Sequence, residues 1–169
     1  MAEKKSTLIT NADVGGSALQ RTYNTARMSF TPSKWERDYN SVAAADSDGD
    51  IYRHCRIPSW ANIRGLWVAN TAITAGTDYD LGGYYTARDG GAVILKDGLL
   101  DGIDMSSARA QPTNLTYQKQ TDLTKVNQLL WQWLGLSADP NKLIDLCWTA
   151  NTVGSAAGTI FLGVEWGHD

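Results

Sequence analysis

The sequence predicts an all-β protein: a β-sandwich, jelly-roll-like, with one α-helix inserted before a C-terminal hairpin. Three observations lead to this prediction. Short runs of alternating apolar and polar residues recur along the chain, clusters of turn residues separate them, and only one stretch has apolar residues at helical spacing. The 169 residues, 43% hydrophobic and 20% charged, suffice for one domain with a substantial core. We expect a flexible N-terminal arm over residues 1–20 and a single β-sandwich domain over residues 21–169.

The first fifty residues divide into four parts. Residues 1–20 are small and polar without a sustained period, which predicts the arm. Residues 21–31 alternate and predict a strand, whereas residues 32–45 predict an irregular segment. The acidic stretch Asp46–Asp50 (DSDGD) is typical of a turn.

The middle of the chain predicts a series of short strands, over residues 51–57, 61–69, 78–85 and 92–95, with a less regular apolar segment over 99–105. In the first of these, alternation predicts that Ile51, Arg53, Cys55 and Ile57 share one face. The second is almost continuously apolar, as in a strand that is buried on both faces. Turn residues at 89–91 and 96–98 are expected to bound the fourth strand.

One helix is predicted, from an N-cap at Thr121 to a C-terminal stop at Gly135. Its first turn holds Asp122, whose negative charge the helix dipole favours there. Trp131 falls off the apolar stripe and is expected to be exposed. The stripe recurs at helical spacing and comprises Leu123, Val126, Leu130, Trp133 and Leu134.

The chain ends with two predicted strands, over residues 143–149 and 159–166. The last strand places Ile160, Leu162, Val164 and Trp166 on one face. We expect the loop over residues 151–158 to join the two strands as a hairpin.

The sequence offers no catalytic constellation. Nucleophilic catalysis by Ser or Cys needs a histidine, and the chain has only two. His54 lies in a predicted strand beside Cys55, so the two side chains should point to opposite faces, and His168 is the penultimate residue. We therefore predict no catalytic residues and a protein that is not an enzyme.

Metal and cofactor sites are not predicted either. Asp46–Asp50 resembles the start of a calcium loop, but Ile51 and Ile57 occupy the positions where such a loop needs Gly and Glu. We interpret it as a solvated turn, with a weak calcium site that borrows a distant carboxylate as the alternative. Cys55 and Cys147 lack zinc-ligand spacing and are interpreted as small buried hydrophobes.

Charge and hydropathy exclude two classes of partner. The formal net charge is −3, and no basic cluster predicts binding to nucleic acid. No segment has the roughly 20 apolar residues that a membrane span requires. The N-terminus leads into no long apolar stretch, so we expect folding in a cytoplasm.

Seven tryptophans make up an unusual share of the chain. Core packing is the expected role of those in predicted strands and the helix, namely Trp67, Trp133, Trp148 and Trp166, with Trp131 as the exception. Trp35 and Trp60 lie in predicted loops. Exposed aromatic residues of this kind indicate either a protein partner or a sugar ligand.

Four segments share a pattern of turns and strands. In residues 46–64 an acidic turn leads into a strand that ends in Pro-Ser and is followed by a second strand. Ala75–Tyr84 has the form of the next strand, Leu134–Pro140 that of a helix end, and Gly158–Trp166 that of a closing strand. Together these segments resemble small structural proteins of tailed phages. The resemblance covers roughly residues 46–166 and leaves the N-terminal arm unaccounted for.

This resemblance implies a virion protein without enzymatic activity, assembled in the host cytoplasm and located in the capsid. The expected function is that of a decoration or cement protein, which binds the major capsid protein in the shell and stabilises it. A homo-oligomer such as a trimer would multiply these contacts. The alternatives are a tail or baseplate structural subunit, or a carbohydrate-binding surface module that uses Trp35, Trp60 or Trp131 as stacking platforms.

Overall fold

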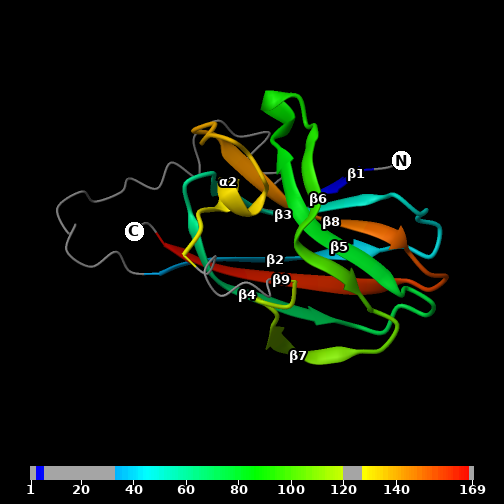
Figure 1. The fold of residues 1–169 in the computed structure, drawn as a ribbon. Helices are drawn as coiled ribbons and strands as arrows, with labels where there is room; N and C mark the ends of the chain where they lie inside the picture. Colours follow the sequence, from blue (N-terminus) through cyan, green and yellow to red (C-terminus); the bar gives the residue numbers. More distant parts are fainter. Residues whose placement is uncertain (1–2, 6–32, 120–126, 168–169) are drawn as a thin grey trace.

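The computed structural model describes residues 3–5, 33–119 and 127–167, which form a sandwich of two β-sheets (Figure 1). Two short helical segments interrupt the strands, η1 (Ala87–Asp89) and α2 (Leu130–Trp133). The strands in chain order are β1 (Glu3–Lys5), β2 (Lys34–Val42), β3 (Ile51–Pro58), β4 (Asn62–Asn70), β5 (Asp78–Tyr85), β6 (Val93–Ile103), β7 (Arg109–Asn114), β8 (Leu143–Thr152) and β9 (Gly158–Gly167).

The strand order is that of a jelly roll. One sheet has the order β1-β3-β8-β5-β6 and the other β2-β9-β4-β7. Apart from β1, which pairs parallel to β3, the strands pair antiparallel. Among β2 to β9 the chain changes sheet at each connection except β5–β6, so strands distant in sequence become neighbours. The predicted fold class is confirmed.

The predicted C-terminal hairpin is wrong. β8 pairs with β3 and β5 in one sheet, and β9 pairs with β2 and β4 in the other. The connecting loop, in which Gly154 has a φ of 90°, leads the chain from one sheet to the other. Both strands alternate as predicted, but alternation says only which side chains face inward and not which strand lies alongside.

Residues 32–45 were expected to be irregular, yet they contain β2, an edge strand of nine residues. Its exposed residues include Trp35, Arg37 and Tyr39, while Val42 reaches the core. Large aromatic side chains therefore lie on the outer face of β2, where a sequence pattern leads one to expect polar residues. The inverted alternation concealed the strand.

The segment from residue 92 to 105 also differs from its prediction. β6 is one strand of 11 residues, and Lys96–Gly98 does not end it. Instead, its register against β5 shifts: Leu95 is paired with Gly83, and Leu100 with Leu81. The turn residues thus form a bulge within the strand. β7 was not predicted, because its six residues are mostly exposed and one is Pro112, which an edge strand tolerates.

The helix is much shorter than predicted. α2 has four residues, and Leu129 before it is extended and bridges to Asn62. The predicted N-terminal turn at residues 121–126 lies outside the described residues. Gly135 has a φ of 70°, which confirms the left-handed stop after the helix. Trp131 is half-buried rather than exposed.

The N-terminal arm is described only over Glu3–Lys5. These residues form β1 and extend the first sheet beyond β3, with Lys4 aligned to Tyr52. The predicted strand over residues 21–31 lies outside the described residues.

Apolar side chains from both sheets fill the space between them. In β9, Ile160, Leu162, Val164 and Trp166 all face this core, as predicted. The largest fully buried side chain belongs to Trp148 in β8. Trp67, however, is half-buried on the opposite side of its strand and does not belong to this core.

This core makes a matched stability test possible. Leu162→Ala removes a fully buried side chain, whereas Leu143→Ala truncates one that is 49% exposed. We expect Leu162→Ala to lower the free energy of unfolding by about 2–5 kcal/mol and Leu143→Ala by less than about 1 kcal/mol. Urea denaturation followed by tryptophan fluorescence would measure both. Equal losses would show that β9 does not line the core.

Candidate functional site

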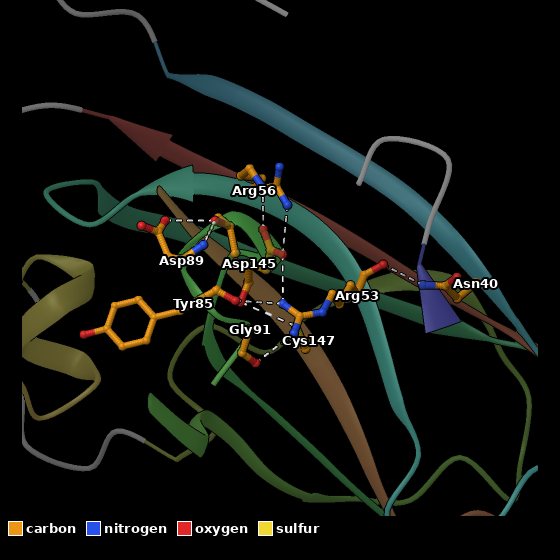
Figure 2. Close-up of polar contacts among 9 residues, drawn as sticks. Asn40, Arg53, Arg56, Tyr85, Asp89, Gly91, Asp145 and Cys147 are labelled. Carbon is orange, nitrogen blue, oxygen red and sulfur yellow. Dashed lines mark hydrogen bonds and ion pairs between the residues drawn. The ribbon is translucent and has the colours of Figure 1, made fainter. Parts of the chain in front are cut away.

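Three charged residues meet on the outer face of the first sheet (Figure 2). Asp145 of β8 is fully buried, and both of its carboxylate oxygens accept hydrogen bonds from β3. Arg53 donates from Nη1 at 2.9 Å, and Arg56 donates from Nε at 2.6 Å and Nη2 at 3.1 Å. Arg53 is itself only 2% exposed, so this is a buried ionic cluster.

A β-bulge brings the two arginines to one side of the sheet. Arg53 is aligned with Cys147 and Cys55 with Leu146, so β3 contains one extra residue, His54. Without the bulge, residues 53 and 56 would point to opposite faces. The prediction that Ile51, Arg53, Cys55 and Ile57 share a face is therefore wrong. Cys55 and Ile57 lie in the main core, while Ile51 packs in a separate cluster with Tyr84 and Cys147.

The cluster extends to neighbouring elements. Arg53 also donates to the carbonyl oxygens of Tyr85 and Gly91, which flank η1, both at 3.0 Å. Its guanidinium carbon lies 5.6 Å from the ring centroid of Tyr84. From β2, the Asn40 amide donates to the Arg53 carbonyl oxygen at 2.8 Å. One side chain thus ties β3 to β8, to the end of β5 and to the turn after η1.

The arrangement supports a structural role for this cluster. A general base needs an oxygen that can accept a proton from a substrate. Both oxygens of Asp145 are engaged by guanidinium groups, and both of those groups belong to arginine, which stays protonated. We therefore assign the cluster to the stability of the first sheet.

Of the residues considered for catalysis, His54 and Cys55 are neighbours in β3, and His168 lies outside the described residues. His54 is fully buried, and burial lowers its pKa to about 4, against the opposing effect of Asp38. Cys55 and Cys147 are both buried and are not joined in a disulfide, and burial raises the pKa of the Cys55 thiol. Bulge and strand geometry place these two thiols on opposite faces of the first sheet.

The acidic turn uses its carboxylates within the fold. Asp46 accepts from the Tyr52 hydroxyl at 3.0 Å, Asp48 from the Val153 amide at 2.9 Å, and Asp50 from the Ser47 amide at 3.1 Å. Together with burial, the bond to Asp46 raises the pKa of Tyr52. Within residues 3–5, 33–119 and 127–167, no group of three or more His, Cys, Asp or Glu side chains could hold a metal ion.

A different site lies on the outer face of the second sheet, over β2, β9 and β4. These three strands run side by side in Figure 1. Their outward residues align in three rows across the strands. We call this surface the aromatic face; its rows are Trp35–Glu165–Gly65, Arg37–Gly163–Trp67 and Tyr39–Phe161–Ala69.

Glycines form the floor under two of the aromatic rings. A Cβ atom at Gly65 would lie 2.8 Å from Trp67 Nε1, and one at Gly163 would lie 3.4 Å from the ring of Phe161. Trp67 therefore leans along its strand toward Trp35, and their ring centroids are 6.1 Å apart. The three rows thus combine large side chains with glycine and alanine.

The aromatic face remains open to solvent. Trp35 is 47% exposed and Tyr39 is 61% exposed, while Trp67 and Phe161 are half-buried. The sequence had indicated Trp35 as an exposed aromatic, but it placed the residue in a loop and did not associate it with the other three. Alternation of residues 35, 37 and 39 was the signal that could have located the face.

The other tryptophans that were considered as stacking platforms are less accessible. The ring of Trp60 packs edge-on against Trp166 at a centroid distance of 5.9 Å and is partly buried. Trp131 is half-buried next to α2 residues that face the core. Among the three candidates, only Trp35 presents a largely open ring.

Comparison with known proteins identifies a fold but not a family. No family model and no curated protein matches the sequence. A chain in a solved structure described as the capsid of Ralstonia phage GP4 is similar with a TM-score of 0.58 and 12% identity, over 82% of this chain and 85% of that one. A chain of the cyanophage Pam1 capsid asymmetric unit gives 0.46 and 15%, over 90% and 96%. At 12% identity the first likeness is one of fold.

Among the described residues, no helix has the length and apolar character to cross a membrane.

The buried cluster leads to a direct prediction. Asp145→Asn leaves two arginines facing a neutral amide in a buried site, and we expect a loss of about 3–5 kcal/mol in the free energy of unfolding. Asp97→Asn is the matched control, because the Asp97–Lys119 pair is partly exposed and should contribute at most about 1 kcal/mol. Urea denaturation of both variants checks this. A loss for Asp145→Asn no larger than that of the control would contradict the structural role.

The burial of His54 predicts that the free energy of unfolding depends on pH. Its pKa falls from an ordinary 6.5 to about 4 on folding, so between these values the unfolded state binds more protons. The stability that its neutral form contributes is complete above pH 6.5 and is lost as the pH falls toward 4, by up to about 3 kcal/mol. The free energy of unfolding, measured from pH 7.5 to 4, should fall more steeply for the unmodified protein than for His54→Gln. Parallel curves would show that His54 is not buried in its neutral form.

Proposed function

We propose that this chain is a virion structural protein that binds the capsid shell and stabilises it as a decoration or cement protein, without enzymatic activity. The single observation that best supports this is the jelly-roll fold, shared over most of its length with a chain of a phage capsid structure.

The chain would stabilise the shell if it bound the assembled shell more tightly than the separated capsid subunits. A chain that binds the assembled shell, and not its separated subunits, raises the stability of the shell by mass action. The major capsid protein would be the partner, and the location would be the virion head. Several copies acting together would gain further by avidity.

The N-terminal arm over residues 1–20 is proposed to assist docking. Its polar, glycine-containing sequence is suited to a segment that becomes ordered against a partner surface. Since Glu3–Lys5 add a strand to the edge of the first sheet, the arm is able to pair with strand edges.

Co-sedimentation tests the proposal. Empty shells of the phage that encodes this chain, prepared without it, are mixed with the purified protein and separated on a sucrose gradient. We expect the protein to migrate with the shells and to raise the temperature at which they disrupt. Shells that already carry the chain serve as the saturation control, and a truncation lacking residues 1–20 should bind more weakly.

Two outcomes would contradict the proposal. One is failure of the folded full-length chain to migrate with shells. The other is electron microscopy of virions with a labelled Fab against this chain that places the label on tails alone, which would support a tail or baseplate subunit instead.

A further inference from the structure

We infer that the aromatic face is the contact between two copies of this chain, packed face to face about a twofold axis. The inference goes beyond shell binding, because it assigns a surface and a partner to the free protein. Three features of the face carry it: its composition, its charges and its extent.

The composition of the face is that of an interface centre. Trp and Tyr are enriched at the energetic centres of protein interfaces, where they bury large areas with few rotatable bonds. Here Trp35 and Tyr39 stand on β2 with roughly half of their surfaces in water. Neither ring is needed to fill the core, which contains residues of the opposite side of the strand such as Val42.

The charges of the face complement themselves. Arg37 is exposed in the middle row, and Glu165 is half-buried in the adjacent row on the neighbouring strand. Neither forms an ion pair within the part of the chain that the structure describes. A partner surface must supply an acid opposite Arg37 and a base opposite Glu165, because a buried charge without a partner is costly. A second copy, turned by a twofold rotation, supplies both.

The extent of the face suits a weak dimer. Its three strands, each nine or ten residues long, cover roughly 30 Å by 14 Å from their rise and spacing, which is about 420 Å². Two copies would bury about 840 Å², which is in the range of weak, transient interfaces below about 1,200 Å². We therefore expect dissociation of the dimer in the micromolar range, and its stabilisation where copies are concentrated.

A charge swap tests the inference. Arg37→Glu places two acids against each other across the axis, and Glu165→Arg places two bases there. Each variant alone should therefore have a dimer dissociation constant at least tenfold higher than that of the unmodified chain. An equimolar mixture of the two variants should restore the dimer, because every contact then joins opposite charges. Arg88→Glu is the matched control, since Arg88 is exposed in η1, outside the aromatic face. Sedimentation equilibrium on the full-length proteins at 1–500 μM, about the range in which a weak dimer forms, measures all five samples, the unmodified chain included.

The outcomes are decisive in either direction. Restoration of the dimer in the mixture, with Arg88→Glu unchanged, supports the inference. It is overturned if the unmodified chain stays monomeric throughout the range, if either single variant remains dimeric, or if the mixture of folded variants stays monomeric. Circular dichroism confirms folding. Shell co-sedimentation of the same variants is read separately, so a monomer that still binds shells rejects this dimer and leaves the proposed function intact.

Discussion

The buried contact between Arg53, Asp145 and Arg56 is the interaction on which the arrangement of the first sheet depends. A sandwich normally buries one face of each sheet, yet β3, β5 and β8 are buried on both. The outer side contains these charges beside a small apolar cluster of Ile51, Tyr84 and Cys147. Two guanidinium groups and one carboxylate satisfy each other there, and they fix the register of β3 on β8, because a shift by one residue would leave the charges unpaired.

The bulge at His54 is the backbone feature that makes this contact possible. One additional residue reverses the alternation of β3, so that Tyr52, Cys55 and Ile57 all enter the core while Arg53 and Arg56 both leave it. A strict period of two cannot produce this distribution. Register in this strand is therefore set by electrostatics on one face and by apolar packing on the other.

Local pattern and long-range pairing account for what the sequence predicted and what it did not. Strands with inward-facing aliphatic residues, such as β9, were located from their alternation, and so was the left-handed stop at Gly135. The predicted C-terminal hairpin was wrong because each strand of a jelly roll pairs with strands that are remote in sequence. β2 was missed because its aromatic residues face outward. The aromatic face could not have been assembled from the sequence, since it needs both the order β2-β9-β4 and the register of these strands.

The placement of the two thiols has a consequence for where this molecule can exist. Cys55 and Cys147 are separated by the thickness of a sheet, and each is enclosed by packed side chains. No oxidant can join them without dismantling β3 and β8, and burial keeps Cys55 in its unreactive protonated form. The fold is thus indifferent to redox conditions, and its covalent structure should be the same inside a reducing cell and in oxidising surroundings.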